Sequence, residues 1–181
     1  MKRIVLILAI ALLALNAENS VAQTKVFKNY VEHWTSHSDT FKKQGKWEVT
    51  QFSGDVLRRL MPQAASNSKS VIAKISNIFQ ITLDDGNQAQ FKRAELLFIH
   101  EPVYNNILSI TLNNTTYKIY KANLKQQQVE YAILINNDKD YCICDIVGYL
   151  NDEQILSFIG VKNDGHKIKG DKMDTVEVIK P

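Results

Sequence analysis

The sequence predicts an α+β protein built on an antiparallel meander sheet of four to six strands, with helices packed mainly on one face. Three observations lead to this fold class. Four segments between residues 107 and 149 are rich in β-branched and aromatic residues, as strands are. Short turns rich in Asn and Asp separate them in pairs, which favours hairpins over parallel crossovers. Apolar residues at helical spacing occur before and after this block.

Residues 1–22 have the three parts of an export signal. Lys2 and Arg3 form a short basic region, an apolar run follows over 4–15, and small residues near Ala22 predict cleavage after it. The apolar run is shorter than the roughly 20 residues that span a bilayer, so we expect no transmembrane anchor. The expected product is exported, either periplasmic or extracellular.

The expected mature chain has one α+β domain over 23–160, followed by a polar tail over 161–181 in which 174–180 is a candidate extra strand. Basic residues are scattered among acidic ones, and the net charge of the whole chain is only +3. Nucleic-acid binding normally requires a concentrated basic patch, so no nucleic acid is expected as a partner.

The first half of the chain predicts short helices between strands. Apolar residues at helical spacing predict helices over 26–34, 56–61 and 71–75. Segments rich in β-branched and aromatic residues predict strands over 47–52 and 78–83.

Two further helices begin at capping patterns. Asn87 stands three residues before Gln90, and Asn151 stands three residues before Gln154. In each pair the two side chains can close a capping box at a helix N-terminus. The first of these helices is expected to end before Pro102.

The four segments of the central block form the meander, with strands expected over 107–112, 115–121, 129–136 and 141–149. Asn113 and Asn114 tolerate the positive φ of a two-residue hairpin turn. This turn pairs Ile110 with Tyr117 and places the apolar residues of the first hairpin on one face.

Loop length also decides where the two cysteines point. A four-residue loop over 137–140 sets Ile135 opposite Cys142 and Ile133 opposite Cys144, on a face without charge. Both thiols are therefore expected to point into the core. Residues two apart on a strand have Cα atoms about 6.5 Å apart, near the outer limit for a disulfide. Buried thiols are favoured over a redox or metal centre.

The opposite face of the second hairpin is unusually apolar for a solvated sheet face. Two interpretations fit: the N-terminal helix covers this face, or it is a contact surface for a partner. The residues on it are Leu134, Tyr141, Ile143, Val147 and Tyr149, around Ala132, Glu130 and Asp145.

The histidines are weak candidates for chemistry. His33 and His37 stand four residues apart on one helix face, a usable spacing for zinc, but no third ligand can be identified. His100 beside Glu101 could act as an acid/base pair, although a histidine at a helix C-terminus more simply complements the helix dipole. No catalytic, cofactor or metal site is therefore predicted.

The order of elements over about residues 41–159 resembles a family of small exported bacterial proteins of unknown function, found in Gram-negative bacteria. The segments that carry the resemblance are GKWEVTQFSGDVLRRL, VIAKISNIFQITL, NNILSITLNNTTYKIYK and VEYAILINNDKDYCICDIVGYLNDEQILSFI. Members are often encoded beside extracytoplasmic sigma factors and their regulators. The resemblance implies an envelope signalling or stress context and supplies no active site.

These observations favour a non-enzymatic exported binding or interaction module without a cofactor. Its expected partner is an envelope protein, or a second copy of the chain, bound through the outer face of the sheet. The alternative is an envelope enzyme or metal-dependent protein that uses His33, His37 or His100.

Overall fold

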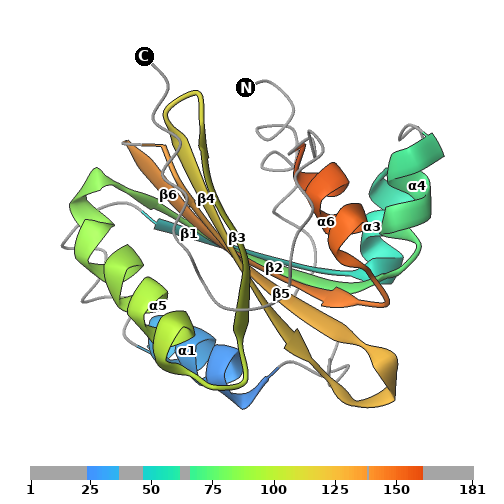
Figure 1. The fold of residues 1–181 in the computed structure, drawn as a ribbon, viewed down its shortest axis with the longest axis horizontal. Coiled ribbons are helices and arrows are strands. Elements are labelled where there is room, and N and C mark those ends of the chain that lie inside the picture. Colours follow the sequence, from blue (N-terminus) through green and yellow to red (C-terminus); the bar gives the residue numbers. More distant parts are fainter. Residues whose placement is uncertain (1–23, 37–46, 62–65, 138, 161–181) are drawn as a thin grey trace.

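One antiparallel sheet organises the part of the chain that the computed structural model describes, residues 24–36, 47–61, 66–137 and 139–160. Its six strands lie in the order β1-β2-β6-β5-β4-β3 (Figure 1). They are β1 (Trp47–Ser53), β2 (Ile75–Asp84), β3 (Asn105–Leu112), β4 (Thr115–Asn123), β5 (Val129–Asn136) and β6 (Asp140–Gly148). The helices are α1 (Lys25–Ser36), α3 (Gly54–Leu60), α4 (Ser66–Ile72), α5 (Gln88–His100) and α6 (Asp152–Ile159). Short 3-10 turns are η2 (Asp85–Asn87) and η3 (Lys125–Gln127).

The predicted α+β class and the antiparallel hairpins are confirmed. Ile110 pairs with Tyr117 across the first hairpin. The turn between them uses Asn113 and Asn114 at φ 50° and 62°, the left-handed conformation that Asn tolerates. The second hairpin pairs Ile133 with Cys144, which is the register expected from a four-residue loop.

Strand β2 differs from its prediction, because it begins at Ile75 rather than at residue 78. Ile75 was expected to belong to a helix, but its backbone pairs with Gly148 at the end of β6. Pairing of β2 with β6 places the first half of the chain beside the last strand, so β6 lies inside the sheet with a neighbour on each side.

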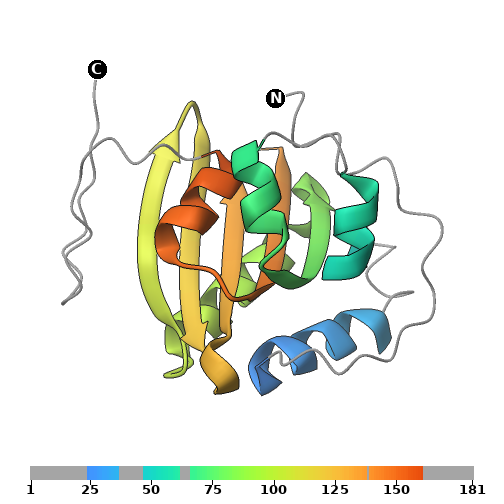
Figure 2. The same ribbon diagram turned by 90° about the vertical axis from the view of Figure 1, so that its right-hand side faces the viewer.

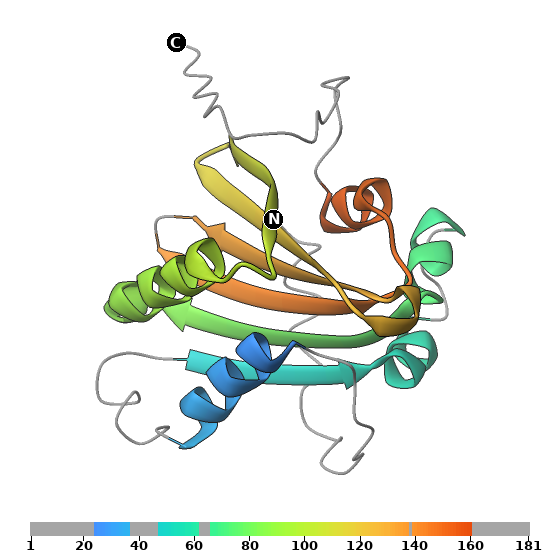
Figure 3. The ribbon, with the colours of Figure 1, turned by 60° about the horizontal axis from the view of Figure 1, so that its bottom comes forward.

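Helices cover both faces of the sheet, and the expectation that they pack mainly on one face is wrong. Helices α1 and α5 lie on one face, and α3, α4 and α6 lie on the other (Figure 3). The reason is that β5 and β6 are apolar on both sides. Ile133 and Leu134 are consecutive and point to opposite faces, yet each is only 1% exposed.

The two capping predictions have different outcomes. At α6 the capping box is confirmed. The backbone amide of Gln154 donates to the Asn151 side-chain oxygen at 2.9 Å, and the backbone amide of Asn151 donates to the Gln154 side-chain oxygen at 3.1 Å. At α5 the helix begins after Asn87 as expected, but no side-chain cap forms. The side-chain amide of Asn87 instead donates to the Asp84 carboxylate at 3.1 Å. The short turn η2 precedes the helix and directs this side chain back toward Asp84.

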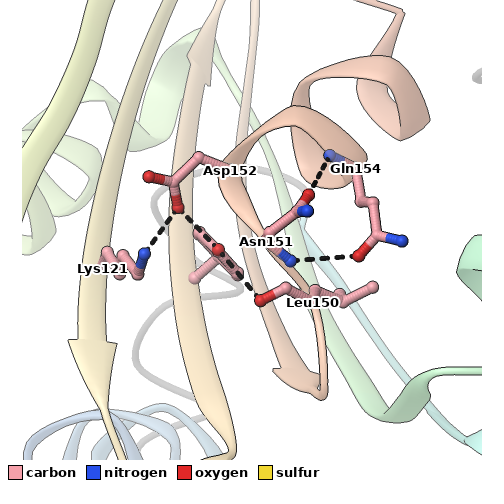
Figure 4. A network of polar contacts seen from close by, with 6 residues as sticks. Lys121, Leu150, Asn151, Asp152 and Gln154 are labelled. Carbon is pink, nitrogen blue, oxygen red and sulfur yellow. Dashed lines mark hydrogen bonds and ion pairs between the residues drawn. The ribbon is translucent and has the colours of Figure 1, made fainter.

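Polar contacts fix the start of α6 on the sheet (Figure 4). One carboxylate oxygen of Asp152 accepts from Lys121 Nζ and from the Tyr131 hydroxyl, each at 2.7 Å. The capping box and this carboxylate together place the apolar side of α6 over the sheet, where Ile155 and Leu156 are buried.

Gly148 is required where β6 meets the chain entering β2. A Cβ atom added at Gly148 would lie 2.3 Å from the Lys74 carbonyl oxygen, a backbone atom that cannot move aside. We expect Gly148→Ala to lower the free energy of unfolding by about 1–3 kcal/mol through this clash. Urea unfolding measures the change, with the exposed Ser157→Ala of α6 as the control. Equal stability of both variants would contradict the close approach.

Candidate functional site

The predicted outer face of the second hairpin is covered from within the chain. Leu134, Tyr141, Ile143 and Val147 are all nearly inaccessible, whereas Tyr149 is 51% exposed. Residues of α1 and α5 provide the cover: the ring of Phe91 on α5 packs at a tilt against Tyr141, with ring centroids 4.8 Å apart. The alternative in which these four side chains form an open contact surface therefore does not hold in the structure.

The cysteines lie on the other face, in the expected register, as free thiols. Each residue is half-buried rather than fully enclosed, and Cys144 packs beside Ile133. Burial raises the pKa of Cys142 to about 12. Burial, and then the nearby Cys142 and Asp145, raise the pKa of Cys144 well above its ordinary value. Thiolates are disfavoured at both positions, which argues against nucleophilic chemistry.

The histidine candidates do not converge in the described part of the chain. His33 is exposed in the last turn of α1, and His100 is exposed at the end of α5. His37 lies outside the described residues. Among the residues described, no three His, Cys, Asp or Glu side chains come close enough to hold a metal ion. Nor is any described helix long and apolar enough to cross a membrane.

The face of the sheet that carries Cys142 and Cys144, the cysteine face, is covered by described helices at one end only. Helices α3, α4 and α6 group over the end of the sheet where Ile75 and Ile146 are buried (Figures 1 and 3). At the other end, toward the turn between β3 and β4, the side chains are half-buried or exposed. We call this area the uncovered face: Ile110, Leu112, Tyr117, Ile135 and Cys142.

The uncovered face reaches a strand edge. In the described residues β3 has a neighbour on one side only, β4, and it lies at the margin of the sheet (Figure 2). The strand sequence NNILSITL contains no charge and no proline, the features that usually protect an edge. Its protection is a register irregularity between Asn106 and Leu108, which leaves residues 108–112 in regular pairing.

A second site lies under α1, where two carboxyl groups are buried. Glu130 on β5 and Asp145 on β6 are each 0% exposed. Glu130 pairs with Val147 and Asp145 with Ala132, so the two acids are diagonal neighbours on one sheet face. Diagonal neighbours are within reach of long side chains, and a hydrogen bond between the two carboxyl groups acts to lower the pKa of Glu130.

Neutral donors hold Glu130. Its Oε2 accepts from the Thr24 amide at 2.5 Å, and its Oε1 accepts from the Tyr104 hydroxyl at 2.5 Å and from the Thr24 hydroxyl at 3.0 Å. Thr24 also caps α1, because its hydroxyl accepts from the Phe27 amide at 3.2 Å and its carbonyl from the Lys28 amide at 3.1 Å. The start of α1 is thereby tied to the centre of the sheet.

Burial dominates the electrostatics of this buried acid pair. Desolvation raises the pKa of Glu130 above 4.5, and the hydrogen bonds from Tyr104 and Thr24 oppose the shift. Burial and the nearby Glu130 raise the pKa of Tyr104, so its phenol stays protonated and donates. The sequence placed Glu130 and Asp145 on one face, but the local pattern contained no signal that α1 would bury them.

No protein-family model, curated protein or solved structure matches this chain. The family resemblance stays a prediction. The candidate sites consequently rest on geometry alone: the uncovered face with its β3 edge, and the buried acid pair.

The thiols should react slowly in the folded protein. With a pKa near 12 at Cys142, the thiolate fraction at pH 8 is far below that of an unfolded cysteine. We expect a thiol reagent to modify both cysteines about 100-fold or more slowly in native protein than in denaturant. Immediate reaction of the native protein would contradict the burial, and no reaction in either state would reveal a disulfide.

Substitutions at Glu130 should separate its hydrogen bonds from its charge. Glu130→Ala leaves the Thr24 amide without its acceptor and opens a cavity, so we expect a loss of about 2–4 kcal/mol in urea unfolding. Glu130→Gln can still accept from Thr24 and should lose less.

The charge itself should appear in the pH dependence of stability. The free energy of unfolding should fall as the pH rises from about 4.5 to the raised pKa of Glu130. The folded state retains a proton in this window that the unfolded state has released. Glu130→Gln should flatten this part of the profile. A profile unchanged by the substitution would mean that Glu130 is ionised throughout.

Proposed function

We propose that this protein is an exported interaction module that binds an extended segment of a partner polypeptide along strand β3. The single observation that carries the proposal is the uncharged edge of β3 beside the uncovered face. Edge strands of this kind are ready templates for strand addition, in which main-chain hydrogen bonds supply affinity and alternate side chains supply specificity.

The side chains beside the edge indicate the chemistry of the partner segment. Leu108, Ile110 and Leu112 alternate along β3 toward the uncovered face, and Ile110 lies opposite Tyr117 on β4. A segment that pairs with β3 would place its own alternate side chains beside this apolar row. We therefore propose an extended partner segment with apolar residues at every second position and no charge among them.

The cellular setting of the proposal comes from the sequence. The export signal over 1–22 supports a location in the periplasm or outside the cell, with an envelope protein as partner. The resemblance to exported proteins encoded beside sigma-factor regulators supports a role in envelope signalling or stress.

Photo-crosslinking from the strand edge tests the proposal. A benzophenone amino acid replaces the exposed Ser109 in the middle of β3, and crosslinks are recovered from the envelope of the producing cell. We expect a crosslink to a different polypeptide, reduced about tenfold by Ile110→Lys, which corresponds to about 1.4 kcal/mol of binding energy. The matched control is Gln51→Lys, which adds the same charge to the exposed surface of the opposite edge strand, β1.

Each outcome of this experiment decides something. A crosslink that Ile110→Lys does not weaken places the partner elsewhere on the molecule. A crosslink only to a second copy of the chain replaces the partner with self-association. Monomeric protein that yields no crosslink contradicts the proposed binding.

A further inference from the structure

The outer side of α5 carries exposed apolar residues. Leu96 is 53% exposed, Ile99 is 48% exposed, and Val103, in the turn after the helix, is 39% exposed. They are three of the six large apolar side chains that stand exposed in the described part of the chain. Leu96 and Ile99 share one helix face because they are three residues apart. We call these three residues the α5 ridge.

Packing of α5 onto the sheet does not use the ridge. The inner side of the helix carries Phe91, Ala94 and Phe98, which are buried. Phe91 packs against Tyr141, and Phe98 against Tyr120 with ring centroids 5.9 Å apart. Helix α5 belongs to the outer layer on the α1 side of the sheet, and no described element covers its outer side (Figure 3). The ridge is therefore an apolar surface that the described structure leaves in contact with water.

Cations border the ridge. Lys92 and Arg93 stand four and three residues before Leu96, on the same side of the helix, and both are exposed. Among the described residues neither of them forms an ion pair. Glu95 is the acidic residue within α5, and it pairs with Lys118 of β4. The outer side of α5 thus combines aliphatic side chains with positive charge.

This composition favours a lipid surface over a protein partner. Aliphatic side chains beside Lys and Arg on one side of a helix are typical of helices that lie in membrane interfaces. The long stems of Lys and Arg follow the apolar surface while their charged ends reach lipid phosphates. Protein interfaces are instead enriched in Tyr and Trp that fill pockets. The ridge contains no aromatic residue, and the surface of a helix is convex.

We propose that α5 docks this protein on the surface of an anionic phospholipid bilayer. Leu96 and Ile99 enter the boundary between headgroups and acyl chains, about 5–10 Å deep, and Lys92 and Arg93 bind lipid phosphates. With 13 residues, α5 is shorter than the roughly 20 that span a bilayer, so it lies along the surface. The docking is independent of strand addition, because α5 and the uncovered face lie on opposite faces of the sheet.

The docking is weak and reversible. Each Lys or Arg near an anionic lipid surface strengthens binding about fivefold, and salt weakens this attraction. The ridge side chains add hydrophobic transfer in proportion to the apolar area that they bury. Such a contact holds the protein beside a membrane and leaves β3 available to a partner.

A fluorophore on the ridge tests the proposal. Ile99→Cys in the full chain is labelled briefly with a nitrobenzoxadiazole reagent, before the half-buried Cys142 and Cys144 react, and intact mass confirms a single label. Vesicles contain phosphatidylcholine alone or equal parts phosphatidylcholine and phosphatidylglycerol. On the anionic vesicles at low salt, we expect the emission to shift to the blue and brominated lipids to quench it. A label at Lys69→Cys, on α4 and the opposite face, should show neither change.

The position of the label makes the test specific to α5. The apolar run over 4–15 can bring the full chain to a vesicle, but such binding does not place residue 99 in the lipid. Blue-shifted emission that brominated lipids quench therefore reports insertion of the ridge itself.

Variants of the labelled chain show which residues act. Lys92→Gln combined with Arg93→Gln should raise the lipid concentration that gives half of the shift at least about tenfold. Leu96→Ser should raise it at least about fivefold. The matched controls, which should leave this concentration unchanged, alter exposed residues of α3 and α4 on the opposite face: Arg59→Gln combined with Lys69→Gln, and Leu60→Ser.

Insertion that depends on both the cations and Leu96 supports the proposal, and three results overturn it. The first is a label that remains in water on anionic vesicles. The second is insertion that is equally strong on phosphatidylcholine alone, because Lys92 and Arg93 would then contribute nothing. The third is protein that does not bind vesicles but forms a dimer that Leu96→Ser dissociates, which assigns the ridge to a second copy of the chain.

Discussion

Burial of the β5–β6 hairpin on both faces is the constraint on which the rest of the structure depends. Consecutive residues of these strands point to opposite sides, and most of them are buried. A sheet of this kind needs a helical layer on each face, because strands that are apolar on both sides cannot face water. The pairing of β2 with β6 and the division of the helices into two groups both follow from this need.

The two layers are held by different chemistry. On the cysteine face, α6 is fixed by the carboxylate of Asp152, which keeps partial contact with water and binds Lys121 and Tyr131. On the opposite face, α1 is fixed by aromatic packing around Phe27 and by the fully buried Glu130. Loss of a hydrogen-bond donor costs more free energy at a buried carboxyl group than at an exposed one, because water cannot replace the donor. The attachment of α1 is accordingly the more sensitive to the charge of its surroundings.

The candidate interaction surface arises because the helical layer on the cysteine face covers only part of the sheet. Helices α3, α4 and α6 are short, and within the described residues they cover the end of the sheet near Gly148 and leave the β3–β4 turn open. Strand β3 carries alternate apolar residues and no charge, yet it lies at an edge of the sheet. The apolar side chains of β3 and its position at the edge therefore disagree, and the strand addition that we propose would resolve that disagreement.

The sequence by itself determined the local structure of this protein. Asn113 and Asn114 predicted the tight hairpin because they tolerate positive φ, and the uncharged pairing of Ile133 with Cys144 selected the right register over one that would bury a charge beside it. The sequence also predicted the capping box at Asn151, because its partner, Gln154, follows three residues later. Only the tertiary structure decided the rest. The cover of Leu134 and Ile143, the burial of Glu130 under Thr24 and the edge position of β3 depend on contacts between residues far apart in the chain. Thr24 and Glu130, for example, are 106 positions apart. Periodicity reports which side of an element is apolar, but the free energy that chooses its neighbour is gained only when the whole core assembles.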